Sequence, residues 1–429
     1  MTKSVDKPTL SEFTTRKDIK IAHLRVPWTN EFAIQPMFRA AFNVENKNTE
    51  GLTHLMEHMI GKTTVNYPKP KEHKILLEKD AIYRNAYTWR HFVGTTLQGA
   101  DDFLEKGMKS AAEELINTTM NEHQLEVEKR AVIQEIKNKD TPEERLGRIK
   151  DYELFGTDYS YRPVGNIDIV EKLTLQQVQD LFNRVICKNN MTLLVGSNRK
   201  NKELERLIDK HFGKLKAGKQ IKLRNAKTRT KKPHKTKFVE QWDKNTVKIH
   251  MIMPIPIKLN KKDLYEVVLL RNFLNRSDTL IKRLRDEEKL VYSCSAATRL
   301  REDPQFCEIV TECEAHNVEK VISHTKMEVD AILGKLTDEV IEEEKRYIAI
   351  QSKFDSKMID ELKDVRKDLV VLDSLKNPFE IYKNWEKIKP EGVRRAYKKY
   401  INTDNVYIAK LVPMKSKAKL HAKIRPPAT

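Results

Sequence analysis

The segment from His54 to His58, with the sequence His-Leu-Met-Glu-His, carries the residues best suited to chemistry. Residues four apart on an α-helix lie on the same face, so both imidazoles can reach one cation. Zinc bound by neutral imidazoles also requires a third protein ligand and an open position for water. Glu57 stands beside the rings and can take a proton from that water. The pattern therefore predicts most of a metallohydrolase site, in inverted zincin order. The alternative is an amphipathic helix that carries two surface or capping histidines.

A second segment, further along the chain, offers carboxylates for the missing ligand position. Residues 125–136 have a strong helical pattern, in which Glu128 and Glu135 are seven apart and so share one face. Most glutamates on such a face are simply solvated charges. The helical pattern alone does not select either residue as a ligand.

The size and composition of the chain favour a folded protein of two or more domains. It has 429 residues, of which 39% are hydrophobic and 33% charged. Every apolar run is shorter than the roughly 18 residues that a membrane helix needs. The N-terminal segment has no apolar core, and its acidic residues are unlike those of a transit peptide. We therefore expect a cytoplasmic protein without membrane insertion.

The formal net charge of +19 would suit a nucleic-acid-binding protein, but the excess is concentrated in two segments. Residues 214–237 hold eleven Lys or Arg and no acid, and residues 409–429 hold six more and no acid. Aromatic residues do not alternate with these lysines, as a base-stacking surface would require. Solvated charge in a connector and a tail is the ordinary explanation, and we do not expect nucleic acid as a partner.

The chain repeats itself at a spacing of about 215 residues. The amphipathic segment 173–186 and the apolar run 191–195 resemble the segment 388–401 and the run 406–412. A second pair of similar segments has nearly the same spacing, 128–135 and 344–351. The repeat predicts two copies of one folding unit.

The grouping of the expected helices and strands favours an α+β fold. Long charged amphipathic stretches at 101–138 and 317–365 are typical of helices, whereas the strand candidates are short. Helices and strands are grouped rather than strictly alternating, which is the α+β pattern. The strand candidates lie at 38–42, 248–253 and 306–311.

We expect three regions along the chain, and metal binding in the first of them only. At the repeat spacing, residues 269–273 stand near the counterpart of the histidine motif, and Gln351 stands where Glu135 does. The second copy thus lacks the ligand types. The regions are an N-terminal metal-binding catalytic domain at 1–213, a basic linker at 214–237, and a C-terminal homologous domain at 238–429.

Taken together, residues 20–412 resemble the pitrilysin–insulinase family of zinc metallopeptidases. That family has His-x-x-Glu-His followed about 76 residues later by a glutamate ligand, and 76 residues separate His58 from Glu135. Glu128 matches a second acidic residue of the family, seven before the ligand. Gly51 matches a glycine that commonly precedes the motif.

Two further segments carry the resemblance. Residues 85–88 resemble the family's Asn-Ala-aromatic-Thr strand, and Arg285 and Tyr292 resemble its Arg and Tyr pair, also seven apart. Glycines usual in the family are missing at Lys289, within 274–279 and within 79–83. These departures leave the substrate range and the loop geometry open, but they do not touch the metal ligands.

The resemblance implies a metallopeptidase half-clam of two homologous α/β sandwich domains in tandem, similar to the mitochondrial processing peptidase type and its bacterial relatives. It implies one zinc ion per chain, held by His54, His58 and Glu135. Glu57 would act as the general base, and Glu128 would orient a ligand or assist proton transfer.

The resemblance also implies a substrate and a partner. Two half-clams would enclose a chamber that takes peptides or unfolded polypeptide, and the second half-clam would come from a homodimer or from a related chain. Arg285 and Tyr292 would bind the substrate and stabilise the oxyanion. The substrate would add as a strand beside Asn85, Ala86, Tyr87 and Thr88. The alternative is a non-catalytic assembly or core-type subunit of the same fold.

Overall fold

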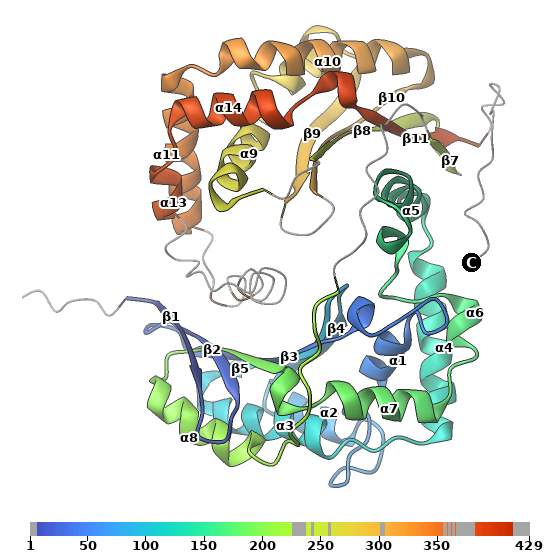
Figure 1. The fold of residues 1–429 in the computed structure, drawn as a ribbon, viewed down its shortest axis with the longest axis vertical. Coiled ribbons are helices and arrows are strands. Elements are labelled where there is room, and N and C mark those ends of the chain that lie inside the picture. Colours follow the sequence, from blue (N-terminus) through green and yellow to red (C-terminus); the bar gives the residue numbers. More distant parts are fainter. Residues whose placement is uncertain are drawn as a thin grey trace, which may run out of the picture. The chain divides into compact units, whose positions relative to one another are not determined.

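Each half of the chain builds one mixed β-sheet with helices on it (Figure 1). The computed structural model describes residues 7–224, 237–241, 244–255, 259–300, 305–354 and 382–414, together with Met358, Leu362 and Val365. The chain forms two units whose segments alternate along the sequence. The first unit comprises Met1–Lys139, Tyr161–Asn225 and Ser356–Phe379, and the second comprises Asp140–Ser160, Ala226–Asp355 and Glu380–Thr429. The expected linker at 214–237 stays a prediction, since residues 225–236 lie outside the described ranges.

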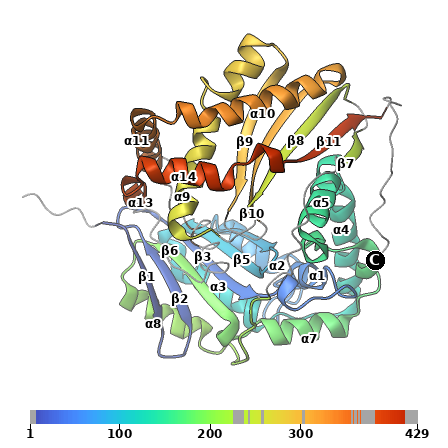
Figure 2. The same cartoon turned by 45° about the horizontal axis from the view of Figure 1, so that its top comes forward.

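The sheet of the first unit has six strands, and β4 forms one edge. β2 and β6 run parallel, whereas the other neighbours are antiparallel. Figure 2 shows these strands side by side, with α3 and α8 along one face. In sheet order the strands are β1 (Thr9–Thr14), β2 (Lys20–Arg25), β6 (Met191–Ser197), β3 (Glu31–Arg39), β5 (Phe92–Ala100) and β4 (Tyr83–Thr88).

The described strands of the second unit form a sheet with the same arrangement, in which no described strand is a counterpart of β1. β7 and β11 run parallel, and the remaining neighbours are antiparallel. Its order is β7 (Lys237–Gln241), β11 (Tyr407–Pro413), β8 (Thr246–Ile255), β10 (Gln305–Glu314) and β9 (Val291–Arg299). Strand order and direction therefore match between the units, which confirms the expected α+β fold with two homologous domains in tandem.

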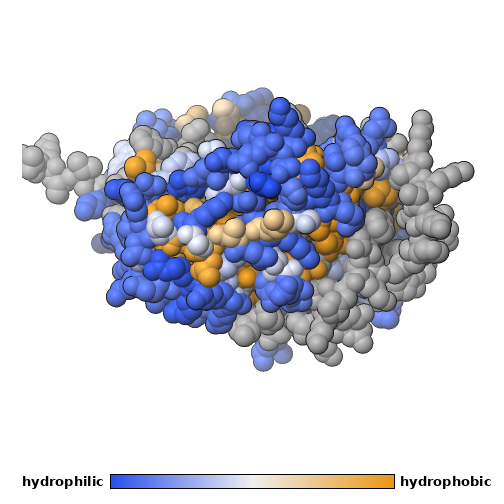
Figure 3. Space-filling view, turned by 90° about the horizontal axis from the view of Figure 1, so that it is seen from above, coloured by the Kyte–Doolittle hydropathy of each residue, from blue (hydrophilic) through white to orange (hydrophobic). Residues whose placement is uncertain are grey.

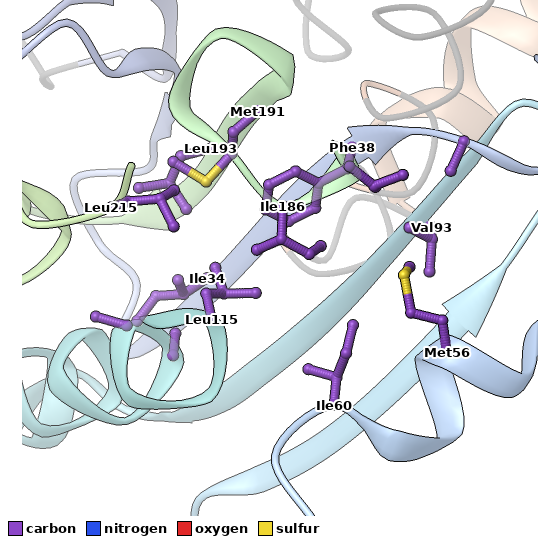
Figure 4. Close-up of a cluster of buried hydrophobic side chains, with 14 of the residues drawn as sticks. Ile34, Phe38, Met56, Ile60, Val93, Leu115, Ile186, Met191, Leu193 and Leu215 are labelled. Carbon is purple, nitrogen blue, oxygen red and sulfur yellow. The ribbon is translucent and has the colours of Figure 1, made fainter. Parts of the chain in front are cut away.

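The helices of the first unit cover one face of its sheet and enclose the larger core. Met56 and Ile60 point from the α1 region toward Val93 and Phe38 on the strands (Figure 4). Thr174 and Gln177 form a capping box that fixes the start of α7. The helices are α1 (Leu52–Met59), α2 (Glu72–Lys79), α3 (Leu104–Ile116), α4 (Glu122–Lys139), α6 (Ile167–Val170), α7 (Leu175–Val185) and α8 (Asn201–Phe212).

The helices of the second unit cover the equivalent face of its sheet. Buried aliphatic residues of α9, α10 and α14 join the strands in one hydrophobic core. A short π-helix at Lys282–Glu287 precedes β9. The helices are α9 (Lys261–Leu274), α10 (Val318–Lys335), α11 (Asp338–Phe354), α13 (Tyr382–Glu386) and α14 (Pro390–Tyr400).

The opposite face of each sheet is covered by a segment from the other half of the sequence. In the first unit Met358, Leu362 and Val365 pack with Leu24 and Phe92. In the second unit α5 (Pro142–Phe155) supplies Leu146, Leu154 and Phe155, which pack with Ile252, Phe306 and Leu411. Each unit is therefore completed by residues distant in sequence.

Three expected elements differ from the structure. The stretch expected to be helical over 317–365 contains two helices, α10 and α11, which are separated at residues 336–337. The strand expected at 38–42 ends at Arg39, because a 3-10 turn follows at Ala41–Asn43, with Ala41 at a φ of 55°. The helix expected over 101–138 is two helices, α3 and α4. Asn121 accepts a hydrogen bond from the N–H of Gln124 and so begins a new helix there.

The described surface is consistent with the high charged content of the chain. The face drawn in Figure 3 is mostly hydrophilic, and apolar side chains show there in small groups. No helix among the described residues is both long and apolar enough to cross a membrane.

Candidate metal centre

Helix α1 places His54 and His58 on one face because its opposite face is apolar. Leu55, Met56 and Met59 are almost fully buried in the core of the first unit. This packing fixes the rotation of the helix, so the two imidazoles project from the same side. The centroids of the two rings lie 4.7 Å apart.

Helix α4 brings Glu135 to the two histidines. Its apolar residues Val132 and Ile136 are buried in the same core, which turns the glutamate face toward α1. One carboxylate oxygen of Glu135 lies 3.5 Å from Nε2 of His54 and 3.5 Å from Nε2 of His58. The three candidate ligand atoms all lie within 4.8 Å of one another. Residues 54, 58 and 135 therefore meet at one point.

Nδ1 of each imidazole already has a hydrogen-bond partner in the protein. Nδ1 of His54 lies 3.2 Å from the carbonyl of Val164 and must donate to it, since a carbonyl only accepts. Nδ1 of His58 lies 3.1 Å from a carboxylate oxygen of Glu128. Both Nε2 atoms are thus left to face Glu135. The two Nε2 atoms and one carboxylate oxygen of Glu135 fit a zinc ion that keeps one open position. The hydrogen bonds at Nδ1 fix the orientation of both rings.

Glu57 lies beside the candidate ligands and is oriented by the neighbouring strand. Its side chain is buried, and the hydroxyl of Thr88 on β4 donates to its Oε2 at 3.0 Å. The same oxygen is 4.0 Å from Nε2 of His54. A carboxylate held this close to the ligand atoms can exchange a proton with a water placed between them.

Ion pairs and hydrogen bonds set the charge of the site. Burial lowers the pKa of His58, but hydrogen bonding to Glu128 and Glu135 outweighs it and raises that pKa to about 9. Hydrogen bonds from His54 and His58 lower the pKa of Glu135. For Glu128, burial raises the pKa, but hydrogen bonds from His58 and Lys62 outweigh it and lower the value. Both carboxylates are therefore held in the charged form that a cation requires.

A pocket of about 410 Å³ opens over these groups. Its wall includes the edge strand β4, which pairs with β5 on one side only among the described strands. The expected substrate-binding residues thus lie beside the candidate metal ligands. The pocket is lined by His54, Glu57, His58, Lys62, Arg84, Asn85, Ala86, Tyr87, Thr88, Glu135 and Lys139.

Arg285 and Tyr292 belong to the second unit. Arg285 lies in the π-helix, and its Nε donates to a carboxylate oxygen of Asp286 at 2.7 Å. Tyr292 lies at the start of β9 and is 89% exposed. Their expected action on a substrate stays a prediction.

Sequence reasoning missed three groups around the site. Lys139 pairs with the second carboxylate oxygen of Glu135 at 2.5 Å, and Lys62 pairs with Glu128 at 3.0 Å. The four-residue spacing of Glu135 and Lys139 on a helix could have indicated the first pair. The carbonyl of Val164 carries no signal in the sequence, because any residue has one.

Comparisons with known proteins place the chain in one family. Residues 43–148 match the family model described as insulinase (peptidase family M16), and residues 172–348 match the model described as the peptidase M16 inactive domain. The uncharacterized zinc protease YmxG of Bacillus subtilis is 20% identical over 332 residues, which cover 76% of this chain and 79% of that protein.

A match to a mitochondrial protein is shorter. The beta subunit of the mitochondrial-processing peptidase of Caenorhabditis elegans is 24% identical over 183 residues, which are 42% of this chain. The match spans only 39% of the length of that subunit.

Solved structures show the same fold. The periplasmic protease PqqL of Escherichia coli superposes with a TM-score of 0.81 at 16% identity, over 98% of this chain and 51% of that one. A protease from Helicobacter pylori superposes with a TM-score of 0.78 at 17% identity, over 95% and 100% of the two chains. With both family models and these neighbours in agreement, the chain belongs to the insulinase (M16) peptidase family and has its half-clam fold.

Proposed function

We propose that this chain is a zinc-dependent endopeptidase, which hydrolyses peptides or unfolded polypeptide segments inside a chamber formed by two half-clams. The observation that supports this most is the meeting of His54, His58 and Glu135 in one pocket with Glu57. Relatives named zinc proteases support the same activity.

His54, His58 and Glu135 would hold one zinc ion per chain. Two imidazoles and a carboxylate favour zinc over the harder cations, which prefer oxygen ligands alone. When bound, zinc would supply the Lewis acidity that polarises a scissile carbonyl and lowers the pKa of a water. Glu128 would hold the ring of His58 through its Nδ1 hydrogen bond.

Glu57 would act as the general base and then as the general acid. Its carboxylate takes a proton from the attacking water as the oxygen bonds to the carbonyl carbon. It then gives that proton to the nitrogen that leaves as the C–N bond breaks. The hydrogen bond from Thr88 holds the carboxylate in place for both transfers.

The substrate would bind as an extra strand along the edge of β4. Asn85, Ala86, Tyr87 and Thr88 lie on this edge and line the pocket. Main-chain hydrogen bonding along an edge strand gives affinity with little sequence preference. Arg285 and Tyr292 would bind the substrate and stabilise the oxyanion, as the family resemblance implies.

The partner would be a second copy of this chain or a related chain. One similar protein is named as a subunit of a mitochondrial-processing peptidase, and one similar structure is a complex III assembly from Candida albicans. The division into a catalytic domain at 1–213, a linker at 214–237 and a second domain at 238–429 is part of this proposal. So is the cytoplasmic location, although the similar PqqL is described as periplasmic.

The second candidate is a non-catalytic assembly or core-type subunit of the same fold. It is favoured by the model described as an inactive domain at 172–348, and by a similar structure from Pseudomonas fluorescens with the same description. The ligand set and Glu57 lie outside that range, in the part that matches the insulinase model.

Hydrolysis of a quenched-fluorescence peptide library by the wild type and by Glu57→Gln tests the proposal. We expect the wild type to cleave peptides, and the variant to bind zinc as the wild type does while turnover falls by roughly 10²–10⁴-fold. Zinc-loaded wild-type protein that cleaves no peptide, alone or with a related chain, would favour the non-catalytic subunit.

A further inference from the structure

Glu45 is a buried glutamate that lies outside both the candidate ligand set and the pocket lining, yet it contacts the start of the helix that carries the histidines. It is 5% exposed. Its Oε1 accepts the N–H of Thr53 at 2.6 Å, and its Oε2 accepts the N–H of Gly51 at 3.0 Å. Gly51 is the N-cap residue of α1 and has no side chain that could cap the helix. The carboxylate of Glu45 therefore accepts two of the N–H groups at the start of α1, those of Gly51 and Thr53.

The same carboxylate also binds the segment 161–165. The hydroxyl of Tyr161 donates to Oε2 of Glu45 at 2.7 Å. Three residues later, the carbonyl of Val164 accepts the hydrogen bond from Nδ1 of His54. One buried carboxyl group thus connects the first turn of α1 with the segment that holds the ring of a candidate zinc ligand.

Two glycines bring these segments into direct backbone contact. Gly51 and Gly165 both have a φ of +96°. A Cβ on Gly51 would lie 2.6 Å from Cα of Gly165, and a Cβ on Gly165 would lie 2.8 Å from Cα of Gly51. No side chain fits between them, so a displacement of one segment is transmitted to the other.

We propose that Glu45 is a positioning residue for the metal site. Its carboxylate fixes the first turn of α1 against the segment 161–165, and thereby fixes the Nδ1 hydrogen bond and the orientation of His54. This inference rests on the proposed zinc function, and it adds a residue that acts through His54 rather than on the metal. Zinc–nitrogen bonds are about 2.0–2.1 Å long, so a small displacement of the ring weakens binding.

The chemistry of the surroundings specifies a carboxylate at position 45. All three of its partners are donors: two backbone N–H groups and one hydroxyl. Burial raises the pKa of Glu45, and the hydrogen bonds from Thr53 and Tyr161 oppose that rise. A glutamine would turn an NH₂ group toward one of these donors and leave a buried polar group unpaired.

Two variants and a matched control test the proposal. Glu45→Gln disrupts the cap and the link together, whereas Tyr161→Phe removes only the hydroxyl that links the two segments. Glu266→Gln is the control, because Glu266 is fully buried in the second unit and accepts a hydrogen bond from Arg395 at 2.9 Å. Zinc affinity is measured by competition with a chelator, site geometry by the absorption spectrum of the cobalt-substituted protein, and folding of the metal-free protein by circular dichroism.

We expect Glu45→Gln to lower the zinc affinity of the folded protein by about 10–100-fold and to change the cobalt spectrum, as loss of an outer hydrogen bond does elsewhere. Tyr161→Phe has the same effect in smaller degree, and Glu266→Gln lowers stability with zinc affinity unchanged. If Glu45→Gln does not fold, the zinc affinity and cobalt spectrum of Tyr161→Phe test the inference by themselves. The inference is overturned if the folded variants Glu45→Gln and Tyr161→Phe have the same zinc affinity and the same cobalt spectrum as the wild type. Wild-type protein that binds zinc but cleaves nothing overturns the proposed function and leaves this test intact.

Discussion

The helix pair α1 and α4 in the first unit and the pair α9 and α11 in the second occupy equivalent places in two sheets of the same strand order. In the first unit the pair presents histidines and glutamates to each other. In the second, residues of α9 near the counterpart of the histidine motif are buried in the hydrophobic core, namely Leu269, Leu270, Phe273 and Leu274. The second unit therefore forms the same scaffold without a histidine pair on this helix.

Glu344 is the counterpart in the second unit of Glu128 in the first unit. It stands 216 residues after Glu128, and it is 4% exposed. Burial raises the pKa of Glu344, and the charges of Arg276 and Arg271 oppose this. Glu128 instead pairs with an imidazole and a lysine. The side chain of Gln351, expected to replace Glu135, lies outside the described residues. Among the described side chains, the second unit therefore differs from the first in lacking the two histidines beside this carboxylate.

The sharpest contrast between the units is expected from Glu135→Gln and Glu344→Gln. Loss of Glu135 removes a candidate ligand, so we expect zinc binding and peptide hydrolysis to fall to background. Loss of Glu344 leaves both intact and changes only the stability of the second unit, because the neighbours of its carboxylate are Arg271 and Arg276 rather than histidines. Metal analysis, peptide turnover and urea unfolding measure these effects. Equal zinc binding in the two variants would contradict the assigned asymmetry.

Acid should destabilise the second unit through Glu308. Burial by itself raises the pKa of Glu308, but hydrogen bonding with His250 and the charge of Lys150 outweigh it and lower the pKa to about 2. Because this folded-state value is below the ordinary 4.5, the stabilisation is complete above about pH 4.5 and is lost as the pH falls toward 2. We expect Glu308→Gln to lower the free energy of unfolding by about 3 kcal/mol at pH 7.

Urea unfolding of the wild type and of Glu308→Gln across pH 2–7 checks this. The two stabilities should converge at the acid end, since the wild-type carboxylate is then protonated. A constant difference at every pH would show that the lost stability does not come from the charge.

Glu128→Gln should weaken zinc binding by about 10–100-fold without abolishing it, because the hydrogen bond to Nδ1 of His58 is outside the ligand set. The affinity is measured by chelator competition. As a control, Glu126→Gln changes a more exposed glutamate of the same helix, whose partner is Lys129. A full loss of zinc in Glu128→Gln would make Glu128 a ligand rather than a support.

The smallest effect is expected from Lys139→Gln. Its side chain is 57% exposed, and ion pairs of this kind contribute less than about 1 kcal/mol. Zinc affinity should change by a few-fold at most, and less at high salt. A large loss of affinity would mean that Lys139 fixes the orientation of Glu135.

The repeat and the histidine motif predicted much of this architecture from sequence. Residues 175–185 of the segment 173–186 form α7, and the apolar run after it forms β6, as the helical period and the short apolar run indicated. The tandem fold is confirmed. The meeting of α1 and α4 could be anticipated only through the family resemblance, because helical spacing alone left Glu128 and Glu135 equivalent.

Other features could not be predicted, for physical reasons. The carbonyl of Val164 and the backbone contact of Gly51 with Gly165 depend on tertiary packing, which local spacing does not encode. Helix α5 packs on the sheet of the second unit, and the segment with Met358 packs on the sheet of the first. Both placements depend on contacts between residues distant in sequence. The break at Asn121 was missed because its side-chain cap competes with helix continuation.

Zinc-edge X-ray absorption of the metal-loaded protein tests the central claim most directly. We expect a zinc ion with two imidazole nitrogens at about 2.0–2.1 Å and carboxylate and water oxygens at about 2.0–2.2 Å. His58→Ala removes one of the three ligands, so zinc binding and its absorption signal should fall to background, as for Glu135→Gln. Sulfur ligands, an all-oxygen shell, or an unchanged spectrum in His58→Ala would contradict a zinc site built from His54, His58 and Glu135.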